Sequence, residues 1–142
     1  MARHGLEGRV AFRGWLHGAQ LPEALATADV LVLPSWAEGL PNAMVEAMAA
    51  GLAVVVSAVG AIPELVTDGV SGRLVRPRDA DSLTRALAET IADGAARERM
   101  ARAGRAIAAR DFGVEEAVER LTLEIGSAVA GGRGRRLSGR TQ

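Results

Sequence analysis

Short apolar runs alternate with amphipathic stretches along this chain. These short runs predict strands near residues 10–13, 29–33, 53–57 and 73–76. Apolar residues at helical spacing predict helices near 21–28, 41–50, 62–67, 80–92, 95–110 and 114–129. Strands that alternate with helices favour an α/β fold, in which a parallel sheet forms the middle of three layers and ligands bind at the carboxyl ends of the strands.

Two carboxylates mark the segment 35–46. Glu38 falls in the loop after the strand at 29–33, and Glu46 falls inside a helix that begins near Pro41 and ends at Gly51. The rest of this helix is small and apolar, which is typical of a helix packed within a domain. Burying a charge without a partner costs several kcal/mol. We therefore expect Glu46 to meet either an internal salt-bridge partner or a ligand.

The spacing of these features suits one long ligand. At about 1.5 Å per helical residue, the two carboxylates should lie about 10 Å apart. Between them, the backbone N–H groups of Gly39, Leu40 and Asn42 at a helix N-terminus can bind phosphate. Carboxylates accept hydrogen bonds from vicinal hydroxyls. A nucleoside diphosphate sugar, with hydroxyls at both ends and phosphates between, fits if both acids open into one cleft.

An ordered set of motifs extends this pattern along the chain: Pro34-Ser35, Glu38-Gly39, Glu46, Ala50-Gly51, Gly60 with Ile62-Pro63-Glu64, and Asp68-Gly69. The set resembles the donor-binding, C-terminal Rossmann-like domain of a retaining family 4 glycosyltransferase of the GT-B fold. The resemblance runs from about Val10 to about Leu123.

This resemblance implies a role for each matching residue. Glu38, with the backbone of Gly39 and Leu40, would bind the donor sugar. Asn42 would contribute to phosphate binding, and Glu46 would bind the ribose hydroxyls. The family transfers a hexosyl group with retention to a glycan or lipid-linked acceptor.

Trp15 and Leu16 stand where the family places the loop that borders the nucleobase. Stacking on the base is one interpretation of Trp15, and packing within the protein is the other. The resemblance implies no catalytic nucleophile or general acid, no cofactor and no metal ion.

The chain departs from the family pattern in two ways. Gly60-Ala61 replaces a usual pair of glycines, so a methyl group could narrow the sugar pocket. The family also binds pyrophosphate with an Arg and a Lys from an upstream strand and loop, and this chain has no lysine. We therefore expect an N-terminally truncated domain, which lacks the acceptor-binding N-terminal domain and is inactive alone.

Two other functions remain as alternatives. One is a fragment that binds a nucleotide sugar without transferring it. The other is a glycosidase that uses Glu38 and Glu46, but hydrolysis requires carboxyl groups about 5–9.5 Å apart across a single bond. The first alternative fits the isolated chain better.

Composition narrows the class of protein further. The absence of cysteine excludes disulfides and thiolate chemistry. Four arginines lie in the stretch 131–142, so the remaining chain has 17 − 4 = 13 basic residues against 17 acidic ones, which disfavours nucleic-acid binding. We expect the domain to span residues 1–129 and a disordered Gly/Arg-rich tail to span 130–142.

No signal peptide is evident at the start of the chain. The uncharged stretch 47–63 is shorter than the ~20 residues that a membrane span needs. We expect a cytoplasmic protein, with peripheral association of the parent protein at the inner face of the membrane as a further expectation.

Overall fold

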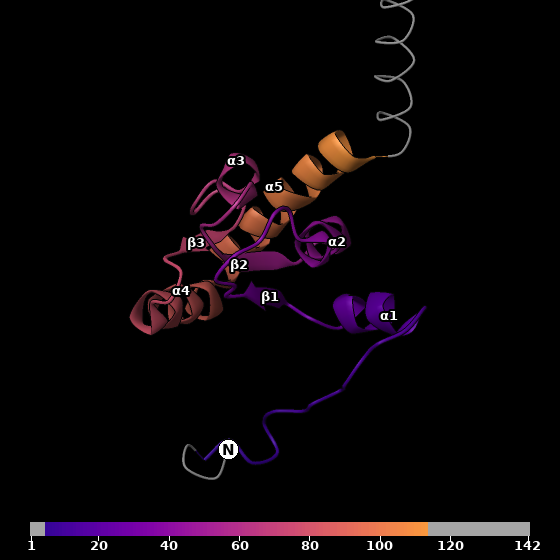
Figure 1. Cartoon of the computed structure of the whole chain (residues 1–142), viewed down its shortest axis with the longest axis vertical. Coiled ribbons are helices and arrows are strands. Elements are labelled where there is room, and N and C mark those ends of the chain that lie inside the picture. Colours follow the sequence, from indigo (N-terminus) through magenta and orange to yellow (C-terminus); the bar gives the residue numbers. More distant parts are fainter. Residues whose placement is uncertain (1–4, 114–142) are drawn as a thin grey trace, which may run out of the picture.

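The computed structural model describes residues 5–113 as a parallel sheet with helices on both faces (Figure 1). The sheet contains β1 (Val30–Leu33), β2 (Ala53–Ser57) and β3 (Arg73–Val75), in the order β1-β2-β3. The helices are α1 (Gln20–Ala26), α2 (Asn42–Ala50), α3 (Ile62–Leu65), α4 (Ala80–Ala92) and α5 (Gly94–Phe112). The predicted α/β class and parallel sheet are confirmed.

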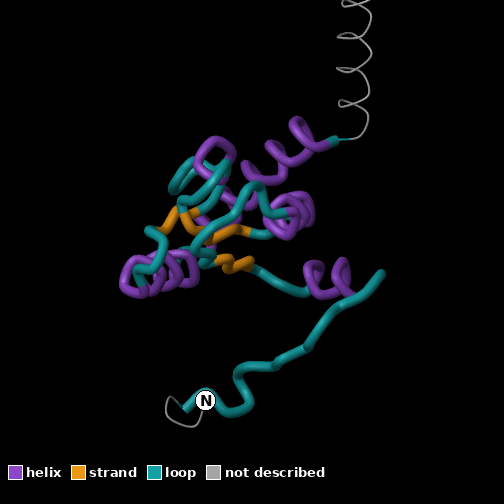
Figure 2. The backbone as a smooth tube through the Cα atoms, in the orientation of Figure 1, coloured by secondary structure: helices purple, strands orange, loops and turns teal. Residues whose placement is uncertain are grey.

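The central strand β2 is buried on both faces. Val54 and Val56 point to the side covered by α2 and α5, whereas Val55 points to the side covered by α4. Figure 2 shows the three strands between these two layers of helices. Burial of each valine stabilises the fold by about 1.5–3 kcal/mol, so β2 and its neighbouring helices form the framework that holds the strand ends.

Helix α2 follows the predicted bounds closely. Pro41 directly precedes its first residue, and Gly51 ends it with φ 84°, in the left-handed region where glycine is favoured. Helix α4 begins and ends at the predicted residues 80 and 92. The predicted helix at 114–129 and the tail at 130–142 lie outside the described residues.

The strand predicted at residues 10–13 is wrong. Residues 10–17 form no helix or strand, and Phe12 is 87% exposed. In Figure 1 this indigo segment runs away from the sheet. A strand requires a neighbour for its backbone N–H and C=O groups, and no strand within residues 5–113 pairs with this segment. Its run of apolar residues, Val10 to Phe12, is therefore insufficient to make it a strand.

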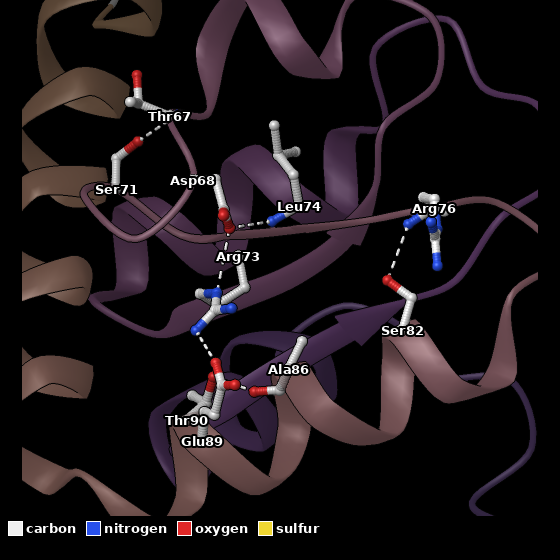
Figure 3. Close-up of polar contacts among 10 residues, drawn as sticks. All are labelled: Thr67, Asp68, Ser71, Arg73, Leu74, Arg76, Ser82, Ala86, Glu89 and Thr90. Atoms are coloured by element: carbon white, nitrogen blue, oxygen red, sulfur yellow. Dashed lines mark hydrogen bonds and ion pairs between the residues drawn. The ribbon is translucent and has the colours of Figure 1, made fainter.

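The Asp68-Gly69 motif shapes the turn into β3 (Figure 3). The Asp68 carboxylate accepts hydrogen bonds from the backbone N–H of Leu74 at 2.9 Å and from Arg73 Nε at 3.1 Å. Arg73 also forms an ion pair with Glu89 on α4. These contacts join the turn, the strand and the helix, so this part of the family pattern has a structural role in this chain.

Candidate functional site

The loop that follows β1 carries Glu38 at the carboxyl end of the sheet. The carboxylate is partly buried and accepts a hydrogen bond of 2.7 Å from the Ser35 hydroxyl. The backbone carbonyl of Gly39 accepts a hydrogen bond of 3.0 Å from the N–H of Ala61. The loop after β1 is therefore fixed both by its own serine and by the loop after β2.

Gly60 brings these two loops into close contact. It adopts φ 56°, and a Cβ atom at this position would lie 2.0 Å from the Glu38 carbonyl oxygen and 2.6 Å from that of Gly39. Only glycine fits this conformation and this space. Ala61 has φ −83°, so its methyl group introduces no left-handed strain where the family usually has a second glycine.

Glu46 projects from the side of α2 that faces away from the sheet. The opposite side buries Met44, Ala47 and Met48, whereas Glu46 itself is exposed. The expected burial of this carboxylate is wrong, because alanines on the outer face of α2 resemble a buried surface in the sequence. Desolvation therefore does not force Glu46 to have a partner within the protein.

A cavity of about 590 Å³ separates α1 from α2 next to Glu46. This α1–α2 cavity is lined by Gly18, Leu21, Pro22, Leu25, Ala26, Glu46, Ala49 and Ala50. Glu46 is the one charged residue among them. The volume falls within the range of about 300–1,000 Å³ that is usual for ligand pockets. Apolar walls with a single carboxylate suit a flat apolar group that is joined to hydroxyls.

The α1–α2 cavity does not unite the two acids. Glu38 is not among its lining residues, so the shared cleft for Glu38 and Glu46 stays a prediction. Leu40 and Asn42 are exposed at the start of α2, where no described side chain caps the helix. The N–H groups at that end therefore face no competing side-chain acceptor from the described part of the chain.

Trp15 and Leu16 lie on the segment that leads into α1, but neither lines the α1–α2 cavity. The indole of Trp15 is 81% exposed, with its ring tilted against His17 at 6.1 Å between centroids. Leu16 is partly exposed and lines a separate cavity of about 350 Å³. Gly18, two residues further on, does reach the α1–α2 cavity.

Sequence reasoning missed the contribution of α1 to the cavity wall. Leu21, Pro22 and Leu25 supply its three largest apolar side chains. The sequence did predict a helix at residues 21–28, directly after the Trp15 loop, and these three residues fall within it. Only the packing of α1 beside α2 shows that these side chains and Glu46 line the same space.

A smaller cavity of about 200 Å³ opens at the ends of β2 and β3. This Trp36–Arg78 pocket is lined by Pro34, Trp36, Ser57, Val75, Arg76, Arg78, Asp79, Ala80 and Leu83. The guanidinium of Arg78 lies over the indole of Trp36, at 4.7 Å from the ring centroid. Arg78 therefore connects the loop after β3 to the loop after β1, which also carries Glu38.

The charges in the Trp36–Arg78 pocket are unevenly compensated. Asp79 accepts a hydrogen bond from the backbone N–H of Ser82 at 2.8 Å and forms an ion pair with Arg76 at 2.6 Å. The hydrogen bond from Ser82, followed by the Arg76 contact, lowers the pKa of Asp79 below its ordinary value of 3.8. Within residues 5–113, Arg78 forms no ion pair. It supplies the uncompensated charge of this pocket.

Two further properties concern metal ions and membranes. In the described range, His, Asp and Glu side chains form no group of three that could hold a metal ion. None of the helices between residues 5 and 113 is both long enough and apolar enough to cross a bilayer.

Comparison with known proteins gives consistent similarities. Residues 1–93 match the family model described as "Glycosyl transferases group 1". The chain is 42% identical over 113 residues to alpha-maltose-1-phosphate synthase of Mycobacterium tuberculosis, a match that covers 75% of this chain and 29% of that protein.

Solved structures show the same likeness. Sucrose-phosphate synthase from Thermosynechococcus elongatus superposes with a TM-score of 0.80 at 30% identity, over 92% of this chain and 33% of that one. Anabaena HepE, solved with UDP and with UDP-glucose, gives 0.80 and 0.78 at 31% identity, over 89% of this chain and 34% of that one. The fold is that of the C-terminal domain of GT-B glycosyltransferases. The chain spans about a third or less of the length of these proteins.

Proposed function

Because this chain belongs to the family of glycosyl transferases group 1, we propose that it binds the nucleotide-sugar donor of a retaining family 4 hexosyltransferase. One observation carries the proposal: Glu46 is the one charged residue lining an apolar cavity of about 590 Å³ between α1 and α2. The cavity takes the nucleoside, and the carboxylate accepts hydrogen bonds from both ribose hydroxyls. Hydrogen bonds to a charged group stabilise by about 1.5–3 kcal/mol.

The phosphates and the sugar of the donor bind near the start of α2. The N–H groups of Gly39, Leu40 and Asn42 take the phosphates and the adjoining edge of the sugar, since a helix N-terminus favours anions. Glu38, held by Ser35, accepts hydrogen bonds from the sugar hydroxyls. Donor binding of this kind uses no metal ion and leaves both acids in binding roles.

The acceptor is a glycan or a lipid-linked sugar, and its sugar residues are bound by other parts of the parent protein. This chain spans 29–34% of the relatives described above, so we assign transfer to the parent and donor binding to the chain. Binding without transfer is our proposal for the isolated chain. Glu38 does not line the cavity next to Glu46, which does not favour the glycosidase alternative, since that alternative needs the two carboxyl groups across one bond.

Calorimetric titration tests the proposal. The chain is titrated with UDP, GDP and ADP, and then with the 2′-deoxy form of the nucleotide that binds most tightly. We expect one diphosphate to bind, and its 2′-deoxy analogue to bind about tenfold more weakly, because Glu46 loses one hydroxyl partner.

Equal affinities for the ribose and deoxyribose forms would contradict the role of Glu46. Failure of all three nucleotides to bind would contradict donor binding by this chain. Uridine and inorganic pyrophosphate serve as controls, since each carries only part of the proposed ligand.

A further inference from the structure

Arg78 combines a backbone conformation that is rare for a residue other than glycine with a contact to an exposed indole. Its φ is 61°, in the left-handed region, and it is the only described residue other than glycine with a positive φ. Its guanidinium carbon lies over the ring of Trp36, an indole that is 70% exposed. Non-glycine residues in strained backbone conformations are concentrated at functional sites. Both features occur at the pocket that Arg78 and Trp36 line.

Stacking on the indole prepares Arg78 for an anion. The aromatic face stabilises the cation and restricts its rotamers, while the N–H groups of the guanidinium can still donate to an anion. Those groups match two oxygens of a phosphate or carboxylate. No described acidic side chain forms an ion pair with Arg78, whereas Asp79 already has Arg76 and the N-terminus of α4 as partners.

The size of the pocket restricts the ligand. About 200 Å³ is too small for a whole nucleotide sugar, but it can hold a phosphate and part of an attached sugar. The pocket shares no lining residue with the α1–α2 cavity. The pocket lies where β2 and β3 end, beside α4, and the cavity for the nucleoside lies beside α1. Figure 1 shows α4 and α1 on different sides of the sheet. In the proposed donor complex, the diphosphate lies at the start of α2 and therefore does not occupy this pocket.

We propose that the Trp36–Arg78 pocket binds a phosphate monoester other than the diphosphate of the donor. On the proposed function, on which this part of the inference rests, the phosphate is carried by the acceptor. Arg78 binds two phosphate oxygens with its guanidinium edge, and Trp36 holds that edge in place. Because the loop of Trp36 also carries Glu38, phosphate in this pocket stands next to the sugar-binding loop.

Nuclear magnetic resonance tests the site with glucose 6-phosphate as the probe. The chain contains two tryptophans, so its ¹⁵N-labelled form gives two indole N–H signals, which the Trp36→Phe variant assigns. We expect glucose 6-phosphate, at ionic strength kept constant with chloride, to shift the Trp36 signal saturably and to leave the Trp15 signal in place. Absence of a saturable Trp36 shift would overturn the proposal.

Arg78→Gly separates binding from folding. Glycine relieves the positive φ, so this variant should melt at the wild-type temperature or above it. Its affinity for glucose 6-phosphate should fall at least tenfold. The matched control Arg99→Ala removes an exposed arginine that does not line the pocket, and it should bind within twofold of wild type. Wild-type affinity in Arg78→Gly would refute the assignment.

Addition of UDP distinguishes the source of the phosphate. If the pocket serves an acceptor, glucose 6-phosphate binds equally well when UDP is saturating, and Arg78→Gly retains wild-type affinity for UDP. Competition between the two ligands would place the donor's own phosphate in the pocket and overturn the proposal. If UDP, GDP and ADP all fail to bind while glucose 6-phosphate still requires Arg78, the proposed donor function fails and the phosphate site stands.

Discussion

We expect Gly60→Ala to destabilise the chain more than a glycine-to-alanine substitution at any other loop position. The new Cβ would lie 2.0 Å from the Glu38 carbonyl oxygen, and the residue would have to keep φ 56° or rebuild the turn. Left-handed backbone costs an L-residue about 1–2 kcal/mol, and overpacking against backbone adds about 1–3 kcal/mol. We expect a loss of roughly 2–5 kcal/mol in the free energy of unfolding, measured by urea titration.

Gly69→Ala is the matched control for this effect. Gly69 has φ 71°, but a Cβ there would meet no atom within 4 Å. The control should therefore lose only about 1–2 kcal/mol in the free energy of unfolding, from backbone strain alone. Equal destabilisation by the two substitutions would show that the contact between the Gly60 turn and the Glu38 loop is unimportant. If Gly60→Ala remains folded, displacement of the loop should weaken donor-sugar binding more than nucleoside diphosphate binding.

Glu46→Gln and Glu38→Gln should weaken the binding of different parts of the donor. Both the nucleoside diphosphate and the intact donor contain the ribose. Loss of the Glu46 carboxylate should therefore weaken both, by about 1.5–3 kcal/mol, or roughly 10- to 150-fold. Glu38→Gln should leave the diphosphate affinity near wild type and weaken the intact donor. Calorimetry of each variant with both ligands measures the difference.

The stability of the Glu46 variant provides an independent check. Glu46 is exposed, so Glu46→Gln without ligand should change the free energy of unfolding by less than about 0.5 kcal/mol. A much larger loss would indicate a structural acid. Equal weakening of diphosphate binding by both substitutions would contradict the division of roles between the two acids.

The features that depend on local pattern could be predicted from the sequence. Val54, Val55 and Val56 indicated a buried parallel strand, and Pro41 and Gly51 defined α2 to within a residue. These predictions succeed because turn residues and apolar runs act locally. The position of Glu38 in a loop at the strand end follows from the same bounds.

The features that depend on long-range packing could not be predicted. The segment near Phe12 has the composition of a strand, but strand formation also requires a neighbouring strand to pair with. Alanines around Glu46 gave no indication of which side of α2 faces the sheet, and the residues of α1 complete a cavity that no single motif describes. The Trp36–Arg78 contact joins loops 42 residues apart in sequence, so its partners could not be paired from local pattern.

Chemical-shift mapping of the nucleoside diphosphate on the ¹⁵N-labelled chain tests donor binding in the α1–α2 cavity most directly. We expect saturating nucleotide to shift the backbone amides of Gly18, Ala49 and Ala50, which line the cavity, and to leave the amide of Ala86, on the buried side of α4, unmoved. The Glu46→Gln variant should need roughly 10- to 150-fold more ligand for the same shifts. Shifts confined to the Trp36–Arg78 pocket, with the three cavity amides unchanged, would contradict the account.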